Sequence, residues 1–263
     1  MGWSSFSYIK NKMYKMYMLN RLKKVAHKVV NSFGFTFLKT SVFENKYRLN
    51  SDFVPLEQLF YKNLHADFFF VQIGANDGVS YDPIFNLVTR EKVKGIVIEP
   101  IKDIFYLLEK NYRDYPQVKP LNVAIHKNQK RKTLYRVDPN KKNYPEWTKG
   151  TPSFNKSHHK LSFIAENDII EEIVECISFN ELIKDFNIKA IDLLQIDTEG
   201  YDAEVIKMID FEIVKPTIIS FEHGMQQGIM SKSQFQECQE LLLKNNYNIV
   251  VLENDAIAYL NRL

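Results

Sequence analysis

Several features are scarce or missing in this 263-residue sequence, and each absence excludes a class of protein. Only two cysteines occur, Cys176 and Cys238, with no CxxC pair and no metal-ligand spacing. We therefore expect two buried thiols in a reducing compartment rather than a disulfide. No apolar run reaches the length of a membrane span, and charges interrupt every apolar stretch of the amino-terminal segment, so that no secretory signal forms. The formal net charge of +3 is too small to predict nucleic-acid binding by itself.

Glycine is also scarce, with nine in the chain, and the stacked glycines of a G-x-G-x-x-G dinucleotide fingerprint are missing. What remains is one turn, Gly74 to Gly78, after the short apolar run of residues 68–73. Such a run suits a strand buried on both faces of a parallel sheet. A second strand-like run, residues 95–98, ends in Glu99. This acid lies about twenty residues past the turn, where nucleotide-binding α/β folds place the carboxylate that binds a ribose.

The glycine turn and the acid together indicate a nucleoside cofactor. A turn without stacked glycines suits a ligand that has no pyrophosphate, and S-adenosyl-L-methionine (S-adenosylmethionine) is the obvious such ligand. Asn76 and Asp77 within the turn are residue types whose side chains hold a hydroxyl or an amine. From this stretch alone, a turn that binds no ligand is the alternative.

Residues 1–50 differ from the rest of the chain. Lysines and arginines, interleaved with aromatic and aliphatic residues, precede the first acid, Glu44. A basic, partly amphipathic helix of this kind lies on an anionic membrane surface or packs on a domain with its lysines in solvent. We favour a packed helical extension and keep peripheral membrane contact as the alternative. The expected organisation is this extension over residues 1–50 and one domain over residues 51–263.

Strand-like and helix-like segments alternate from residue 55 onward, which predicts a mostly parallel sheet with helices on both faces. The runs 248–252 and 257–260 predict an antiparallel hairpin at the end. The expected fold class is therefore α/β, a Rossmann-like doubly wound seven-stranded sheet with a carboxyl-terminal antiparallel hairpin and a helical amino-terminal extension. The other expected strands cover residues 68–73, 95–98, 118–125, 132–137, 173–178, 190–196 and 216–221.

Residues 138–160 form the least regular stretch of the sequence. A loop this long inside a compact domain is usually functional or disordered. We predict a lid or a substrate-side loop. The alternative is a surface loop in which His158 and His159 are solvated, and these adjacent histidines are weak metal candidates because they point in different directions.

Ligands of open α/β sheets bind beyond the carboxyl ends of the strands. The expected strands place polar residues or glycines at one such rim, and their coincidence there predicts a binding site. The candidate residues are Gly74, Ala75, Asn76, Asp77 and Gly78 after the first strand, Glu99 and Pro100 after the second, Asn122, Val123 and Ala124 after the third, and then Asp197, Glu199, Glu222 and His223.

These motifs resemble the class I S-adenosylmethionine-dependent methyltransferases and, within them, the FkbM family. The resemblance covers roughly residues 65–225, and Asp-x-Glu-Gly at residues 197–200 is its most family-specific part. The residues that carry it are 70–78, 97–100, 122–124, 193–202 and 218–223. Gln72 departs from the pattern, because many relatives have Asp there. The change weakens a carboxylate contact to the cofactor amine, for which Asp77 or Asp197 can compensate.

The resemblance implies methyl transfer from S-adenosylmethionine to an oxygen, commonly a hydroxyl of a sugar, a glycan or a secondary metabolite. The cofactor site that it implies comprises Gly74, Ala75, Asn76, Asp77, Gly78, Glu99, Pro100, Asn122, Val123, Ala124 and Asp197. An alcohol is a poor nucleophile at neutral pH, so we expect a base. His223 is the first candidate because the unperturbed pKa of histidine is about 6.5, and Asp197, Glu199 and Glu222 are the others.

Further alternatives stay open. A variant assisted by Mg²⁺ on Asp197, Glu199 and Glu222 ranks below a histidine base. N-methylation ranks lower, because Asp-Thr-Glu-Gly stands where an Asn/Asp-Pro-Pro-aromatic turn is usual. An NAD-dependent oxidoreductase is a weaker alternative, because this sequence has no stacked glycines. A non-catalytic nucleotide-binding module is another alternative, but it does not explain the acids at the strand ends.

We expect a small-molecule or glycan acceptor, no nucleic acid, and a cytoplasmic location with membrane-peripheral contact as the alternative. The sequence makes no prediction of the oligomeric state.

Overall fold

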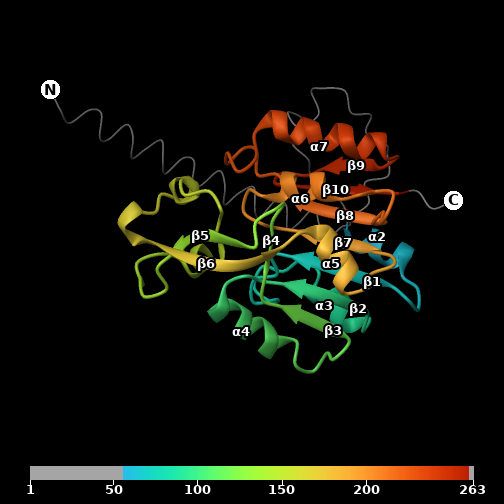
Figure 1. Cartoon of the computed structure of the whole chain (residues 1–263), viewed down its shortest axis with the longest axis horizontal. Coiled ribbons are helices and arrows are strands. Elements are labelled where there is room, and N and C mark those ends of the chain that lie inside the picture. Colours follow the sequence, from blue (N-terminus) through green and yellow to red (C-terminus); the bar gives the residue numbers. More distant parts are fainter. Residues whose placement is uncertain (1–55, 261–263) are drawn as a thin grey trace, which may run out of the picture. The chain divides into compact units, whose positions relative to one another are not determined.

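The computed structural model describes residues 56–260, and the helical extension predicted over residues 1–50, like its boundary, lies outside the described residues. The described part contains a seven-stranded sheet of order β3-β2-β1-β7-β8-β10-β9 (Figure 1). Its strands are β1 (Phe69–Ile73), β2 (Lys94–Ile98), β3 (Val118–Leu121), β7 (Leu193–Ile196), β8 (Ile218–Glu222), β9 (Asn248–Val251) and β10 (Asp255–Tyr259). Strands β3, β2, β1, β7 and β8 run parallel, and β10 pairs antiparallel with both β8 and β9. The predicted fold class is confirmed.

Helices cover both faces of this sheet. One face carries α5 (Phe179–Asp185), α6 (Asp202–Met208) and α7 (Lys232–Lys244), and the other carries α2 (Leu56–Asn63), α3 (Phe85–Arg90) and α4 (Lys102–Asn111). Successive strand side chains point to opposite faces. Val71 therefore joins the core under α5 to α7, whereas its neighbour Phe70 joins the core under α2 to α4. This two-sided burial explains why the strands read as continuous apolar runs.

Side chains that the sequence marks as helix caps fix where helices begin. The Ser178 hydroxyl accepts the Glu181 backbone N–H, and the Glu181 carboxylate accepts the Ser178 N–H in return, which forms a capping box at the start of α5. Asp82 accepts the backbone N–H groups of Ile84 and Phe85, just ahead of α3, which begins at Phe85. These caps set where each strand ends and the next helix starts, and hence the position of the rim.

A second sheet, of order β4-β6-β5, lies beyond the carboxyl ends of the parallel strands (Figure 1). Its strands are β4 (Ala124–Ile125), β5 (Arg131–Val137) and β6 (Ile169–Ile177). The prediction of one continuous strand over residues 118–125 is wrong, because β3 and β4 belong to different sheets. The Asn122 side-chain amide donates to the carbonyl oxygens of Glu99 and Pro100, both at 2.9 Å. The chain is thereby held to the end of β2, and it leaves the main sheet there.

The loop of residues 138–160 runs between β5 and β6 with the 3₁₀ turns η2 (Glu146–Gly150) and η3 (His158–Ser162), and η4 (Glu166–Asp168) follows. Ser153 bridges back to Tyr135 of β5 through two backbone hydrogen bonds of 2.9 and 3.0 Å. His158 and His159 are only 7% and 8% exposed, so the alternative in which they are solvated is wrong. The loop is therefore packed on the domain.

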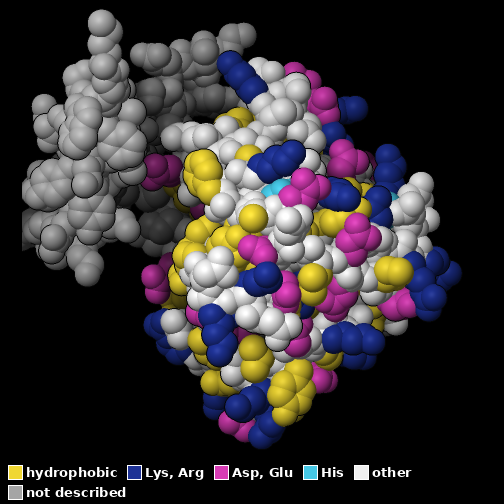
Figure 2. All heavy atoms as spheres, turned by 90° about the vertical axis from the view of Figure 1, so that its left-hand side faces the viewer, with side chains coloured by type: hydrophobic (Ala, Val, Ile, Leu, Met, Phe, Trp, Pro, Cys, Tyr) yellow, Lys and Arg dark blue, Asp and Glu magenta, His cyan; other side chains and the backbone are white. Residues whose placement is uncertain are grey.

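Cys176 and Cys238 are both buried and free, as the sequence predicts. Within residues 56–260, no helix has the length and apolar character that a membrane crossing requires. On the face drawn in Figure 2, Lys and Arg side chains alternate with Asp and Glu side chains rather than forming a patch of one sign. That mixed surface does not give a nucleic acid a continuous basic footprint on this face.

Candidate functional site

Two cavities open at the carboxyl ends of the parallel strands, and both are lined by Gly74, Asp197 and Glu199. The first, here the Glu99 cavity, has about 490 Å³ including its open mouth. Its other lining residues are Ile73, Ile98, Glu99, Pro100, Val123, Ala124, Ile125, Leu134, Pro152, Phe154 and Thr198. The second, here the Glu222 cavity, has about 1710 Å³ including its open mouth. Its other lining residues are Leu56, Gln72, Ala75, Asn76, Ser80, Tyr81, Asp82, Pro83, Trp147, Thr151, Gln195, Ser220, Glu222, Leu252, Asn254, Asp255 and Ile257.

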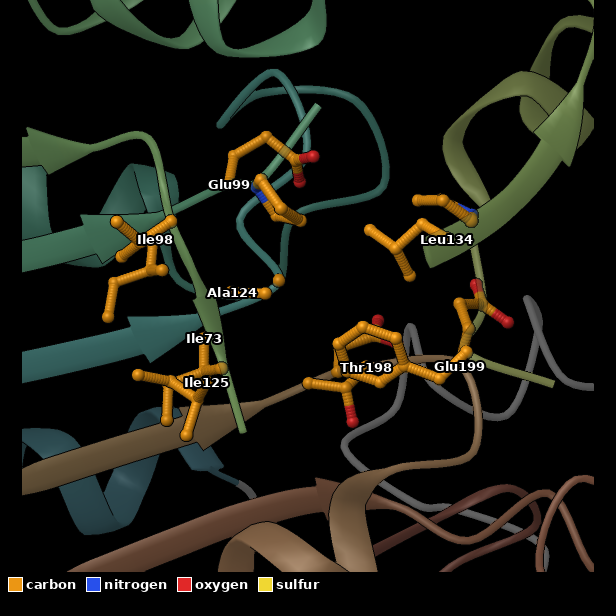
Figure 3. A pocket seen from close by; sticks show the side chains of 14 residues that line it. Ile73, Ile98, Glu99, Ala124, Ile125, Leu134, Thr198 and Glu199 are labelled. Atoms are coloured by element: carbon orange, nitrogen blue, oxygen red, sulfur yellow. The ribbon is translucent and has the colours of Figure 1, made fainter. Parts of the chain in front are cut away.

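Glu99 stands at the end of β2 and is buried against the Glu99 cavity. Its Oε1 accepts the Ile101 N–H at 2.8 Å and its Oε2 accepts the Asn76 N–H at 3.1 Å. Burial raises the pKa of this carboxyl to about 7. Because a carboxylate offers about four acceptor positions, Glu99 can still accept two hydroxyl donors. Figure 3 shows it across the cavity from Thr198 and Glu199.

The rest of the Glu99 cavity is mostly apolar. Apolar side chains from the end of β2, from the chain after β3, from β5 and from the loop after β5 form its walls, namely Ile98, Pro100, Val123, Ala124, Leu134 and Phe154. Figure 3 shows Leu134, from β5 of the second sheet, facing this space from the side opposite Ile98. An apolar slot with the buried carboxyl of Glu99 at its edge is suited to a flat base joined to a ribose.

Gly74 is required where β1 approaches β7. Its φ is +80°, and a Cβ atom there would lie 1.7 Å from the carbonyl oxygen of Asp197. Glycine removes both the steric conflict and the strain of a positive φ. Ala75 and Asn76 follow on the rim of the Glu222 cavity. The backbone turn of residues 74–76 thus lies at the junction of the two cavities.

Three predicted cofactor residues line neither cavity. The Asp77 carboxylate accepts the backbone N–H groups of Val79 and Ser80 and so closes its own turn. Gly78, with φ +76°, packs against the side chains of α4 and the residue after it, and Asn122 holds the end of β2. For these three, the side-chain contacts in the structure support the loops rather than a ligand.

Polar residues form a row across the sheet inside the Glu222 cavity. Gln72 of β1, Gln195 of β7 and Ser220 of β8 are in register on adjacent strands. Gln72 and Gln195 are 3% and 4% exposed. The Gln72 amide nitrogen donates to Asp82 at 2.8 Å. Within residues 56–260, the Oε1 atoms of both glutamines lack a hydrogen-bond partner, so two buried acceptors in this cavity await a donor.

Acidic side chains gather around the junction of the cavities. Enclosure by protein raises the pKa of Asp197 well above its usual value, and the charges of Glu199 and Glu222 act in the same direction. The Asp197 side chain is nevertheless exposed, because it faces the two cavities. Burial, followed by repulsion from the charges of Glu199, Asp202 and Asp255, raises the pKa of Glu222 to about 8. A carboxyl with a raised pKa is a stronger base than an ordinary one once it is ionised.

Asp202 supports this junction from behind. Its Oδ2 accepts the backbone N–H and the hydroxyl of Thr198 at 3.1 and 2.6 Å, and its Oδ1 accepts the Glu222 N–H at 3.1 Å. Asp202 is completely buried, and burial raises its pKa to about 6. The last acid of the Asp-x-Glu-Gly-x-Asp segment, Asp202, therefore ties the end of β7 to the end of β8.

His223 lies away from both cavities. Its ring is buried and packs against Phe235 at a centroid distance of 4.9 Å. Nε2 donates to the Leu252 carbonyl oxygen, and Nδ1 accepts the Met225 N–H, both at 3.3 Å. Burial lowers the pKa of His223. Both ring nitrogens are thus engaged by backbone, and this geometry does not support the predicted role of His223 as the base.

The loop of residues 138–160 borders both cavities. Trp147 and Thr151 line the Glu222 cavity, and Pro152 and Phe154 line the Glu99 cavity. The Ser153 hydroxyl donates to the carbonyl oxygen of Glu199 at 2.7 Å. The position of residues 138–160 therefore agrees with the predicted substrate-side loop. That this loop moves as a lid stays a prediction.

Glu199 also meets His158 from this loop, with Nε2 and Oε2 3.1 Å apart. Glu199 has a φ of 53°, which is uncommon for a residue other than glycine. No sequence pattern indicates this pair, because the two residues are 41 positions apart. A signal for Gln195 did exist, since a polar residue inside an otherwise apolar strand indicates a face that is not packed in a core.

The raised pKa of Glu222 predicts a pH-dependent stability. Between the ordinary pKa of glutamate, 4.5, and about 8, the native state holds a proton that the unfolded chain has lost. Stability therefore falls as pH rises through this window. Because glutamine does not ionise, Glu222→Gln is expected to have a Tm that increasingly exceeds the wild-type Tm as pH rises from 5 to 8.5. Thermal melts of the protein without ligand measure this difference.

The matched control is Glu240→Gln, on the exposed surface of α7. Its Tm should differ from wild type by a pH-independent amount. A Glu222→Gln difference that is equally flat would place the pKa of Glu222 near its ordinary value.

Comparison with known proteins assigns the chain to a family. Residues 72–249 match the profile of the methyltransferase FkbM domain. No curated protein sequence matches the chain. A solved FkbM methyltransferase from Methylobacillus flagellatus aligns with 13% identity and a TM-score of 0.44 over 73% of this chain, and the alignment spans 43% of that protein.

Two other solved structures align with lower scores. Aeropyrum pernix fibrillarin, solved with natively bound S-adenosyl-L-methionine, shares 8% identity at a TM-score of 0.36 over 74% of this chain and 66% of its own. A precorrin-6y C5,15-methyltransferase from Geobacter metallireducens shares 10% identity at a TM-score of 0.39 over 78% and 87%. The domain match over residues 72–249, rather than these structures, carries the family assignment.

Proposed function

Because the chain belongs to the FkbM methyltransferase family, we propose that it transfers a methyl group from S-adenosylmethionine to a hydroxyl of a sugar, a glycan or a secondary metabolite. The observation that carries the proposal is the meeting of two cavities at Gly74 and Asp197. One cavity has the lining expected for a nucleoside, and the other is polar and open. Such a junction lets a cofactor and an acceptor approach each other from opposite sides.

The residues of the Glu99 cavity fit the cofactor. Glu99 would hold the ribose hydroxyls, since both of its oxygens retain acceptor capacity beside their backbone bonds. Val123 and Ala124 would flank the base. The orphaned Oε1 of Gln72 would accept the cofactor amine, so the amide can still serve where many relatives have an Asp. Bound in this way, S-adenosylmethionine supplies a methyl group already activated by its sulfonium.

The protein then has two tasks, to align the acceptor and to remove its proton. Asp197 lies at the junction, and its pKa is raised. We assign the base to Asp197, in place of His223, with Glu199 beside it. Residues 147–154 would exclude water from the junction, because they line both cavities.

The decisive experiment is a calorimetric titration of the full chain with S-adenosylhomocysteine and with NAD. We expect binding of the sulfur compound and no heat from NAD. In Glu99→Ala the ribose loses two charge-assisted hydrogen bonds, each worth about 1.5–3 kcal/mol. The Kd for S-adenosylhomocysteine should therefore rise by at least about tenfold.

Glu109→Ala, an exposed acid on α4 that lines neither cavity, is the matched control and should bind with the wild-type Kd. Circular dichroism checks that both variants fold. Tight binding of NAD with no response to S-adenosylhomocysteine would reject the proposed function, and an unchanged Kd in folded Glu99→Ala would remove Glu99 from the site.

A further inference from the structure

The described charged side chains that line the Glu222 cavity are all acidic. Five of its lining residues are acids, namely Asp82, Asp197, Glu199, Glu222 and Asp255. Among its described lining residues none is lysine, arginine or histidine. An acidic lining without a basic residue is complementary to a cation rather than to an anion.

Unpartnered buried oxygens give an independent sign of a ligand. Within residues 56–260, Oε1 of Gln195 and Oε2 of Glu222 are buried and accept no hydrogen bond. Gln195 as a whole is only 4% exposed. Both residues line the cavity. Buried acceptors are almost always satisfied in native proteins. These two therefore require a donor that a ligand brings.

The geometry of the strands separates this group from the cofactor amine. Glu222 and Asp255 are directly opposite each other on the antiparallel strands β8 and β10. Asp197 follows β7, and Gln72 lies on β1 beyond it. Because adjacent strands are about 4.8 Å apart, Asp255 on β10 is three strands, or on the order of 14 Å, from Gln72 on β1. One ammonium cannot contact both Gln72 and Asp255, so the cofactor amine held by Gln72 does not occupy this group.

Aromatic side chains stand at the mouth of the same cavity. Tyr81 is 83% exposed and has a φ of 61°, and Trp147 is 44% exposed. Both line the cavity. A positive φ in a bulky residue is uncommon and costly, and it keeps Tyr81 turned out of the core. Aromatic faces and carboxylates together are a common environment for protonated amines.

We propose that Glu222, Asp255 and Gln195 bind a protonated amino group of the methyl acceptor. The inference rests on the proposed function and narrows its substrate class to alcohols that carry an amine, such as amino sugars. An ammonium has three donors and no acceptor, so it can donate to both orphaned oxygens, and its positive charge favours the ionised form of Glu222. A neutral hydroxyl has a single donor and brings no charge to the acids of this cavity. The described residues contain no group of three or more His, Cys, Asp or Glu side chains placed to hold a metal ion, which favours an organic cation over a metal ion.

The test measures binding of matched sugars to the full chain saturated with S-adenosylhomocysteine. The probes are glucosamine against glucose, galactosamine against galactose, and 2-aminoethanol against ethylene glycol, followed by saturation-transfer NMR. In at least one pair the amine is expected to bind at least about tenfold more tightly than its hydroxyl partner. Glu222→Gln/Asp255→Asn should abolish the preference and leave the Kd for S-adenosylhomocysteine unchanged.

Glu253→Gln is the matched control, because this exposed acid belongs to the same hairpin and lines neither cavity. It should keep the preference. If the double variant does not fold, the single variants Glu222→Gln and Asp255→Asn replace it, and each should reduce the preference by at least about threefold.

Equal binding within every pair, no binding of any amine, or a preference that survives in the double variant would overturn the inference. Stabilisation by MgCl₂ that disappears in the double variant would assign the acids to a metal ion and would overturn it as well. Binding of S-adenosylhomocysteine distinguishes these outcomes from failure of the proposed function. The proposed function fails only when S-adenosylhomocysteine itself does not bind.

Discussion

Replacement of Asp197 by asparagine is expected to lower kcat by about 10²–10⁴, the usual contribution of a general base. Asparagine keeps the size of the side chain but cannot take a proton. Asp197 is the acid that lines both cavities and has a raised pKa. Because an alcohol is a poor nucleophile while protonated, loss of this acceptor leaves an aligned but unreactive hydroxyl.

The measurement is transfer of a labelled methyl group from S-adenosylmethionine to the glycan and metabolite extract of the native cells. Saturating cofactor separates kcat from affinity, which should also fall because Asp197 borders the Glu99 cavity. Only the ionised carboxylate accepts a proton, so the wild-type kcat/KM should rise with pH through the raised pKa of Asp197. The Asp197→Asn profile should lack that rise.

Two companion variants sharpen the assignment. His223→Ala should keep near-normal turnover once its folding is confirmed, because both ring nitrogens bond backbone groups. Glu199→Gln should lose less than Asp197→Asn, since the Glu199 carboxylate is already paired with His158. If instead His223→Ala is inactive and Asp197→Asn is active, the assignment of the base to Asp197 is wrong and the sequence-based choice of His223 is right.

The sequence predicts the positions of the site better than the directions of its side chains. Carboxyl ends of parallel strands meet at one edge, so finding the strands was enough to bring Gly74, Glu99 and Asp197 together. Past a strand end the backbone turns, and the alternation that fixes side-chain direction stops. Asp77 and Asn122 therefore look like ligand-binding residues in the sequence, yet Asp77 bonds the backbone of its own turn and Asn122 bonds the backbone at the end of β2.

What the sequence could not predict depends on contacts between distant segments. The second sheet needs the pairing of β5 with β6 across a long loop, and only the folded chain brings Ser153 and His158 to Glu199. His223 shows the same limit. Its position after β8 is right for a base, but the hairpin that follows supplies the Leu252 carbonyl group that occupies its Nε2.

Gly74→Ala is expected to cause the largest loss of stability and to remove cofactor binding. A Cβ atom at this position would lie 1.7 Å from the Asp197 carbonyl oxygen, so β1 and β7 cannot keep their present approach. The positive φ costs about 1–2 kcal/mol for a residue with a side chain, and overpacking adds about 1–3 kcal/mol. Displacement of Asp197 would deform both cavities, and the Kd for S-adenosylhomocysteine should rise by at least about tenfold.

Gly200→Ala separates strain from collision. Its φ is +101°, but an added Cβ would meet nothing closer than the Ile229 carbonyl oxygen at 3.5 Å. It should therefore lose only the strain energy of about 1–2 kcal/mol and keep a cofactor Kd near that of wild type. Urea unfolding and calorimetry of both variants give the two comparisons. Equal losses of stability would mean that the approach of β1 to β7 is loose, whereas a larger loss in Gly74→Ala, with cofactor binding gone, ties the glycine to the junction where the cavities meet.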